Sequence, residues 1–346
     1  MQHRQFSESC LCGLGDLFGS FFLTQHYGLF TAISAGDAGL RDRLLRSDPI
    51  VGPVEDAGRS PRSRPTRNLL LLLLFVLFSG FCYGVLDSRR IRVEHVTVPC
   101  PDLPPALDGF TIVQLSDLHS TPDFDLNREA ARLLEGMRAD LLVITGDFRN
   151  SGGTPRTAAE GARLVVLPAM PRMPVYAVQG NNDNAETMKL LEADGIRILD
   201  NRAVQVKAGL WLAGWNPYKK DRPALAEVMR TVPRGAPAIL AAHSPDVILE
   251  KGFSRAQLIL AGHTHGLQIR VPGLPSPITL TRVGWRYTRG LYRVDGSYLY
   301  INRGIGTTMI PLRVYSAPEI TELKLRHQDA KTPKRIGVLS DGGGGN

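Results

Sequence analysis

Hydrophobic positions form one long continuous run near residue 70 and only short runs after it. Residues 69–86 carry no charge, are mostly apolar and open with six leucines. At about 1.5 Å per residue, a helix of this length spans roughly 27 Å, close to the hydrocarbon core of a bilayer. A signal-peptide core is usually shorter, and no small-residue cleavage site follows here. The run therefore predicts a single transmembrane anchor at 69–86, with a cleaved signal as the alternative. Arginines flank it on both sides and leave its orientation open.

After residue 101 the pattern changes to short apolar runs separated by helical spacing. Leu133, Leu134 and Met137 share one face of a predicted helix over residues 126–137. Alternating apolar and polar positions over 287–325 predict antiparallel strands that close the domain. Five short runs predict buried strands, at residues 110–115, 141–145, 175–178, 238–242 and 258–260. Strands of this length alternating with helices predict a layered α/β domain, which we place at residues 99–325.

The two ends of the chain lack these patterns. Residues 52–67 are rich in Pro, Arg and Ser. Residues 1–68 are therefore predicted to be a disordered basic extension. Residues 327–346 end in four Gly and an Asn, which predicts a flexible tail.

Composition narrows the class of protein. The 346 residues are 43% hydrophobic and 21% charged, which excludes a wholly disordered chain and a polytopic membrane protein. The net charge of +8 allows contact with anionic lipid, phosphate or nucleic acid. Much of the local basic excess flanks the apolar run, where anionic lipid explains it. Basic clusters with interleaved aromatic residues are missing after residue 101, so no nucleic-acid partner is expected. None of the four Cys lies beyond that point, which excludes a disulfide framework there.

Polar residues of metal-binding type follow five of the predicted strands. They are Asp117 and His119, Asp147, Asn181 with Asn182 and Asp183, His243, and finally His263 and His265. The carboxyl ends of strands in open α/β sheets meet at one edge, where sites form. Each Asp-x-His or His-x-His pair points its two side chains the same way in an extended segment. Seven ligands of mixed oxygen and nitrogen type suit two divalent metals such as Mn, Fe or Zn.

Read in order, these residues resemble the calcineurin-like metallophosphoesterase superfamily. The pattern is Asp-x-His, Gly-Asp, Gly-Asn-x-Asp, a lone His and Gly-His-x-His over residues 115–268. Later residues, among them Asn302-Arg-Gly-Ile-Gly and Ile310-Pro-Leu-Arg, resemble its membrane-anchored branch, as does an anchor just before the domain. The resemblance implies a β-sandwich flanked by helices, preceded by one transmembrane helix. It implies a single-pass membrane protein, with the side of the catalytic domain open.

The resemblance also implies a site, carried over residue by residue. Asp117, His119 and His265 would hold one metal; Asn181, His243 and His263 would hold the other; Asp147 would bridge both. Catalytic roles fall to Asp147, Asn182 and Asp183, and substrate contacts to Arg149, Asn182 and Arg303. The implied reaction is hydrolysis of a phosphodiester or pyrophosphate by a hydroxide between the metals.

Two residues depart from the family pattern: Asn182, and Leu267, which stands where Gly is frequent. Asn182 stands where relatives often have His, and its amide can donate a hydrogen bond but cannot act as a general acid. A good leaving group such as a nucleotide monophosphate fits this change. Some anchored relatives hydrolyse UDP-2,3-diacylglucosamine in lipid A synthesis, so a lipid-linked phosphorylated substrate is one candidate. A metal-binding scaffold that recruits partners at the membrane, and a general phosphodiesterase acting outside it, are the alternatives.

Overall fold

The computed structural model describes residues 64–270 and 280–327. The predicted tail and most of the predicted N-terminal extension lie outside these residues. Helix α1 (Arg64–Arg89) contains the whole apolar run. It begins five residues before the predicted start at 69, because Arg64 to Asn68 continue the helix. Residues 66–89 are long and apolar enough to cross a membrane by length and composition, with little of the helix buried.

The first sheet contains six strands in the order β1-β12-β2-β3-β4-β5. Their bounds are β1 Arg92–Pro99, β2 Thr111–Leu115, β3 Leu141–Ile144, β4 Val175–Ala177, β5 Arg197–Ile198 and β12 Glu319–Arg326. Strands β2 to β5 run parallel, whereas β12 is antiparallel to β2 and parallel to β1. Strand β1 begins at Arg92, before the predicted domain start at residue 99, and pairs with β12 at one edge of this sheet.

The second sheet also contains six strands, in the order β10-β11-β9-β8-β7-β6. Their bounds are β6 Arg202–Lys207, β7 Leu210–Trp215, β8 Ala238–Ala242, β9 Leu258–Ala261, β10 Gly290–Val294 and β11 Ser297–Ile301. Strands β7, β8, β9 and β11 are parallel, and hairpins add β6 and β10 at the two edges. The predicted antiparallel closure is thus found in the β10–β11 hairpin and in the β12–β2 pair.

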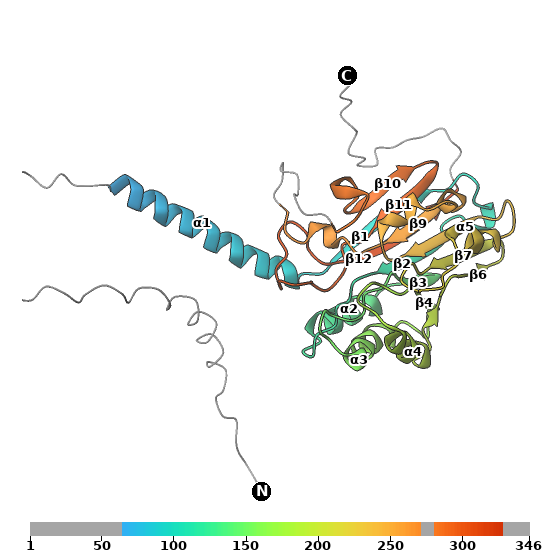
Figure 1. Ribbon diagram of the computed structural model, residues 1–346, viewed down its shortest axis with the longest axis horizontal. Helices are drawn as coiled ribbons and strands as arrows, with labels where there is room; N and C mark the ends of the chain where they lie inside the picture. Colours follow the sequence, from blue (N-terminus) through green and yellow to red (C-terminus); the bar gives the residue numbers. More distant parts are fainter. Residues whose placement is uncertain (1–63, 271–279, 328–346) are drawn as a thin grey trace, which may run out of the picture. The chain divides into compact units, whose positions relative to one another are not determined.

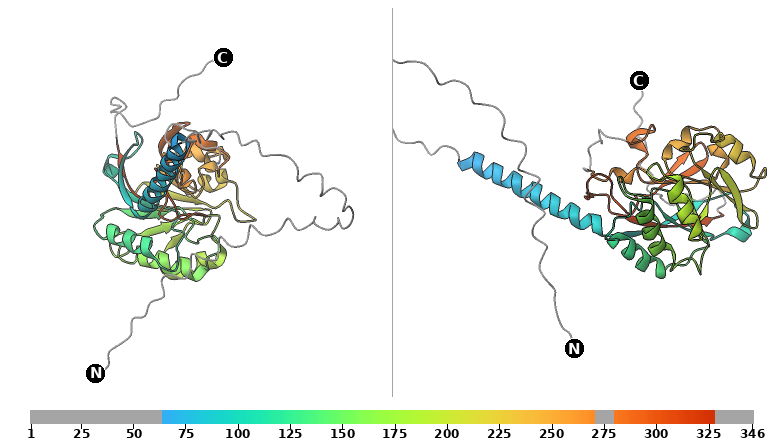
Figure 2. Two further views of the ribbon diagram at one scale, coloured as in Figure 1. Left: turned by 90° about the vertical axis from the view of Figure 1, so that its left-hand side faces the viewer. Right: turned by 60° about the horizontal axis from the view of Figure 1, so that its bottom comes forward.

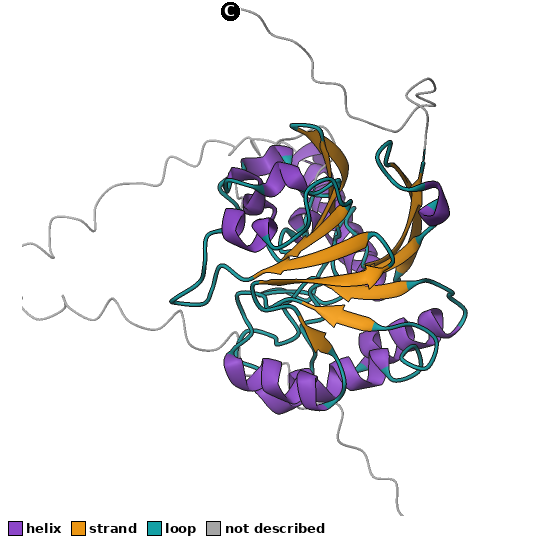
Figure 3. Ribbon diagram, turned by 90° about the vertical axis from the view of Figure 1, so that its right-hand side faces the viewer, coloured by secondary structure: helices purple, strands orange, loops and turns teal. Residues whose placement is uncertain are grey.

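The two sheets pack face to face, and helices cover their outer faces (Figure 3). Buried side chains such as Ile112, Val143, Leu212 and Leu260 form the core between the sheets. Helices α2 (Asp125–Glu135), α3 (Pro155–Val166) and α4 (Ala185–Ala193) lie together on the first sheet (Figures 1 and 2). Helix α5 (Leu225–Arg230) packs on the second. This is the predicted sandwich flanked by helices.

Local sequence explains where these helices begin. Helix α3 starts with Pro155 after Thr154, whose side chain accepts a hydrogen bond from the Thr157 N–H. Asn184 caps α4 in the same way, through Thr187. Both caps lie just after loops that carry predicted site residues. Each helix therefore begins directly after one of these loops and leads the chain away from it.

Candidate metal centre

Loops at the carboxyl ends of β2, β3, β4, β8 and β9 bring the predicted ligands together. Five of these residues have a positive φ: Asp117, His119, Asp147, His263 and His265, with values of 49°, 38°, 55°, 69° and 51°. A left-handed backbone is uncommon outside glycine and costs of order 1–3 kcal/mol per residue. Such conformations cluster at functional sites, where the surrounding fold holds them in place.

The first cluster consists of Asp117, His119 and His265, all of them buried. The Nε2 atoms of the two histidines lie 3.1 Å apart, and Asp117 Oδ1 lies 3.4 Å from His265 Nε2. The carbonyl of Arg149 lies 3.0 Å from His119 Nδ1, which orients that ring. Three ligand atoms therefore converge on one point.

The second cluster consists of Asp147, His243 and His263, with Asn181 beside them. His243 Nε2 lies 3.0 Å from the Asn181 Oδ1 atom and 3.1 Å from His263 Nδ1. Its other ring nitrogen, Nδ1, lies 2.7 Å from the carbonyl of Thr145. Donation of that Nδ1 proton to the carbonyl leaves the Nε2 lone pair free to bind a metal.

Asp147 lies between the two clusters. Its Oδ2 atom is 3.5 Å from His119 Nε2 and 3.4 Å from His243 Nε2. One carboxylate oxygen thus faces a histidine of each cluster, and the bridging of two metals by Asp147 stays a prediction.

The chemistry of these residues fits divalent cations. Among the described residues, the buried Asp117 Oδ1 atom has no hydrogen-bond partner, although an unpaired buried carboxylate oxygen is costly. Burial opposes protonation of His243, but the negative charges of Asp147 and Asp117 outweigh it and raise the His243 pKa to about 10. The site therefore favours positive charge, and oxygen and imidazole ligands suit Mn, Fe or Zn.

Asp183 connects two loops of the site through hydrogen bonds. Its buried carboxylate accepts hydrogen bonds from four backbone N–H groups, at 2.9–3.0 Å: those of Asp147, Phe148, Arg149 and Gly180. Burial and the nearby Asp147 charge raise the pKa of Asp183 to about 6. The carboxylate thus ties the loop after β3 to the loop after β4.

The other predicted contacts are engaged within the protein. Asn182 donates to Asp147 twice, from its backbone N–H (2.8 Å) and from its side-chain amide (2.6 Å). Arg149 donates to the carbonyls of Asn182 and Gly153. Arg303 pairs with Glu94 and Glu319, each at 2.7 Å. Substrate contact by these three residues stays a prediction.

Arg313 was not among the predicted site residues, yet it is fully buried against the first cluster. Its guanidinium donates to the carbonyls of Ser316 (2.9 Å) and Arg303 (3.0 Å), and Nη2 lies 3.3 Å from His265 Nδ1. It therefore joins the His265 loop to the segment after β11. The only sequence signal was its place in Ile310-Pro-Leu-Arg, quoted above for the branch resemblance.

Two glycines are required by close approach. A Cβ atom on Gly262 would lie 1.8 Å from Ser116 Oγ and 2.5 Å from Asp117 Oδ2. A Cβ on Gly180 would lie 2.1 Å from Asp147 Oδ1. The Gly-His and Gly-Asn pairs of the sequence thus allow two loops to meet at the ligands.

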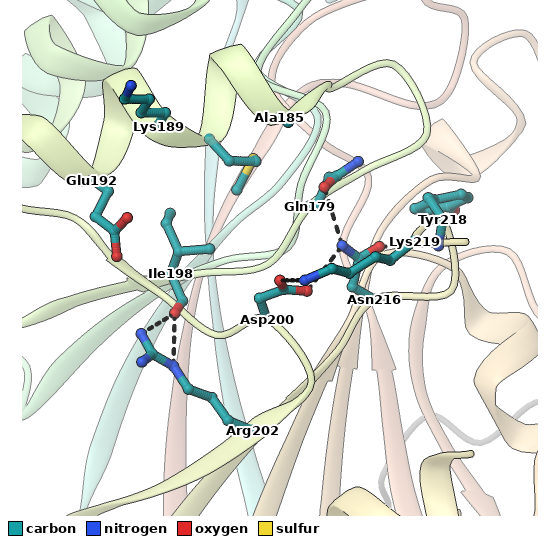
Figure 4. A pocket seen from close by; sticks show the side chains of 11 residues that line it. Gln179, Ala185, Lys189, Glu192, Ile198, Asp200, Arg202, Asn216, Tyr218 and Lys219 are labelled. Atoms are coloured by element: carbon teal, nitrogen blue, oxygen red, sulfur yellow. Dashed lines mark hydrogen bonds and ion pairs between the residues drawn. The ribbon is translucent and has the colours of Figure 1, made fainter. Parts of the chain in front are cut away.

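Two cavities flank Tyr218 beside the second cluster. A cavity of about 350 Å³ is lined by Asn181 and His263, together with Trp215 and Arg282. A second cavity, of about 580 Å³, is lined by polar residues (Figure 4): Gln179, Lys189, Asp200, Asn216 and Lys219 among others. Tyr218 lines both, and its ring lies edge-on to His243 with centroids 6.1 Å apart.

The model of the calcineurin-like phosphoesterase family matches residues 110–267, which span both clusters. Residues 110–267 belong to the calcineurin-like phosphoesterase family. The chain is accordingly a metal-dependent hydrolase of phosphoric esters or anhydrides.

Three relatives are similar to this chain over more than two thirds of its length. The uncharacterized metallophosphoesterase YkuE of Bacillus subtilis is 29% identical, over 72% of this chain and 92% of its own. A transmembrane protein with a metallophosphoesterase domain from Danio rerio is 28% identical, over 82% and 68%. The UDP-2,3-diacylglucosamine pyrophosphatase LpxG of Chlamydia trachomatis is 24% identical, over 76% and 98%.

Proposed function

We propose that this protein is a membrane-anchored hydrolase that cleaves phosphodiester or pyrophosphate bonds with two divalent metals. The observation that carries the proposal is the position of the Asp147 carboxylate between two ligand clusters. The catalytic domain extends from Arg92 to Arg326, and α1 is the one candidate membrane span among the described residues.

The chain's own residues hold the metals from both sides. Asp117, His119 and His265 bind one metal. Asn181, His243 and His263 bind the other, and Asp147 is shared. Two metals held this way polarise a phosphoryl group and lower the pKa of a bound water. The metals are Mn, Fe or Zn, in keeping with the carboxylate, amide and imidazole ligands.

Asn182 restricts the leaving group. Its amide donates to Asp147, and an amide has no proton to give to a departing oxygen near pH 7. Bonds to leaving groups that depart without protonation are therefore favoured. A nucleoside monophosphate, released from a pyrophosphate, is such a group.

A lipid-linked pyrophosphate is the substrate class we infer. Helix α1 keeps the site at a membrane, and LpxG is named for cleavage of UDP-2,3-diacylglucosamine. The two cavities beside Tyr218 offer space for the parts of such a substrate that do not react. We propose UDP-2,3-diacylglucosamine as the first substrate to test.

The test is a hydrolysis assay on the full chain in detergent, with and without Mn²⁺. The substrates are UDP-2,3-diacylglucosamine, with UMP as the product measured, and a bis-aryl phosphodiester. We expect Asp147→Ala to abolish turnover. Asp295→Asn, in the exposed β10–β11 turn, is the matched control and should leave turnover unchanged.

The outcomes test separately whether the protein is a metal-dependent hydrolase and whether UDP-2,3-diacylglucosamine is its substrate. Hydrolysis of the phosphodiester without UMP release would reject the lipid substrate and keep the hydrolase. Full activity of Asp147→Ala would reject the metal centre. UDP-2,3-diacylglucosamine is made on the cytoplasmic face, so a catalytic domain found outside by protease accessibility would also exclude that substrate.

A further inference from the structure

We propose that the loop of residues 307–315, with Ile269 beside it, is a second membrane-contact surface that lies on an anionic bilayer next to α1. We call these residues the bilayer loop. The inference rests on the proposed anchoring by α1 and goes beyond it, because it brings the catalytic domain itself into contact with lipid.

The bilayer loop packs directly on the last turns of α1. The rings of Tyr83 and Tyr315 lie 5.5 Å apart, and the carbonyl of Gly84 accepts from the Arg313 N–H at 3.4 Å. A Cβ atom on Gly84 would lie 2.7 Å from Leu312, so the approach is close. The apolar run of α1 continues to Leu86. A loop that touches Tyr83 and Gly84 therefore lies at the level of the bilayer interface, where tyrosine is common.

The side chains that the bilayer loop presents to its surroundings are apolar. Met309 is 93% exposed, the highest value among the large hydrophobic side chains of the described chain. Ile310 and Tyr315 are each 54% exposed, and Ile269 is 43% exposed. An apolar group of this kind beside a membrane helix loses water contact when it enters the interface, which is favourable.

The loop is built to hold these side chains outward. The Gln268 side chain donates to the carbonyls of Thr308 (3.0 Å) and Ile310 (2.7 Å) and accepts from the Thr308 N–H. Met309, between them, has a φ of 60°, which is uncommon for a side chain of its size. The hydrogen bonds thus fix a strained conformation in which Met309 gains little contact with the protein.

Basic groups beside the bilayer loop favour anionic lipid as its partner. Arg270 joins the loop through its backbone N–H, which donates to Val314 at 3.0 Å. Arg289 donates to the Tyr315 carbonyl at 2.6 Å. Burial and the charge of Arg270 lower the pKa of Arg289, and the Glu319 carboxylate that opposes this shift is already paired with Arg303 at 2.7 Å. Arg289 therefore has no carboxylate of its own among the described residues. Lipid phosphates would supply the negative charge.

The bilayer loop is also tied to the metal centre. Immediately before it, the Ile305 and Gly306 N–H groups donate to the carbonyls of Ser116 (3.0 Å) and Asp117 (2.7 Å). Contact of the loop with lipid would therefore hold the ligand edge of the sheets close to the bilayer surface. A phosphate at that surface would then lie near the metals.

The test measures how deep single positions lie in a membrane. The full chain, with every cysteine except buried Cys100 replaced by serine, is placed in phosphatidylcholine–phosphatidylglycerol nanodiscs. One cysteine per protein is labelled with an environment-sensitive fluorophore at Met309→Cys, Ile310→Cys, Phe75→Cys or Leu167→Cys. Phe75, in α1, reports anchoring. Leu167 is 51% exposed and lies directly after α3, so it is the matched control.

We expect the fluorophores at positions 309 and 310 to be blue-shifted by the apolar environment and quenched by shallow spin-labelled lipid. Deep spin-labelled lipid should quench the fluorophore at position 75. Position 167 should show neither effect. Quenching at 75 with positions 309 and 310 behaving like 167 would overturn the bilayer loop and leave anchoring intact. Absence of quenching at 75 would reject both. Two loop positions are used so that one misfolded variant does not decide the result.

Discussion

Arg313 Nη2 lies 3.3 Å from Nδ1 of His265, inside a fully buried site, although both groups can carry positive charge. Burial and the charge of neighbouring His119 and Arg313 lower the pKa of His265 to about 3, although the negative charge of Asp117 acts to raise it. His265 is therefore neutral at physiological pH, as a metal ligand must be. The arginine thus contacts the Nδ1 atom of a predicted ligand, and its charge helps to lower the pKa of that ring.

Replacing Arg313 should damage the first cluster. Arg313→Met would leave several buried carbonyls without a donor, at a cost of about 3 kcal/mol or more. Arg313→Lys should not restore these hydrogen bonds, because an ammonium group cannot reproduce the planar set of N–H donors of a guanidinium. Chemical denaturation measures the loss. A variant as stable as the parent would show that the buried guanidinium is not needed.

Gly262→Ala should remove activity through a steric effect alone. The new methyl group would meet Ser116 and Asp117 at distances that atoms do not adopt, so the two loops must part. We expect destabilisation of about 1–3 kcal/mol and loss of turnover. Gly136→Ala is the control, since its nearest contact would be a carbonyl at 3.8 Å. Equal turnover in both variants would contradict the close approach.

Asp183→Asn should weaken the site without removing a ligand. The carboxylate accepts four N–H groups, whereas an amide turns one NH₂ toward donors. Loss of an outer-shell partner typically costs about 10–100-fold in metal affinity or activity. Metal titration of turnover measures the shift. An unchanged metal requirement would assign Asp183 no positioning role.

Asn182→His should broaden the range of leaving groups. A histidine there could protonate a departing alkoxide, and general acid catalysis contributes about 10²–10⁴-fold where it operates. We expect kcat/KM for an alkyl phosphodiester to rise relative to an aryl one. The ratio of the two constants is the readout, which a uniform loss of stability would not alter. A constant ratio would mean that position 182 does not face the leaving group.

The sequence predicted most of what builds the site. Apolar runs followed by Asp, Asn or His gave the strand ends, because a buried parallel strand is a short continuous run. Strands β1, β5, β6 and β7 were not predicted. Strand β1 has a half-exposed pattern with no buried run, and it is fixed by its pairing with β12, more than 200 residues later. Such long-range pairing leaves little local signal.

Roles within the site were harder to predict than positions. Substrate contact by Asn182 and Arg303 stays a prediction, and in the fold their polar atoms meet Asp147, Glu94 and Glu319. Those partners lie far away in the sequence, and no spacing rule connects them. Arg313 carried no spacing signal either, since its partners are mostly backbone carbonyls of other loops.

The most direct test of the account is the metal content of the purified full chain, measured by inductively coupled plasma mass spectrometry beside its turnover. We predict two equivalents of divalent metal per chain. We also predict loss of metal and of hydrolysis in Asp147→Ala, with both retained in Asp295→Asn. A chain that hydrolyses phosphodiesters with one metal or none, or an Asp147→Ala variant that keeps two metals and full turnover, would contradict the shared ligand.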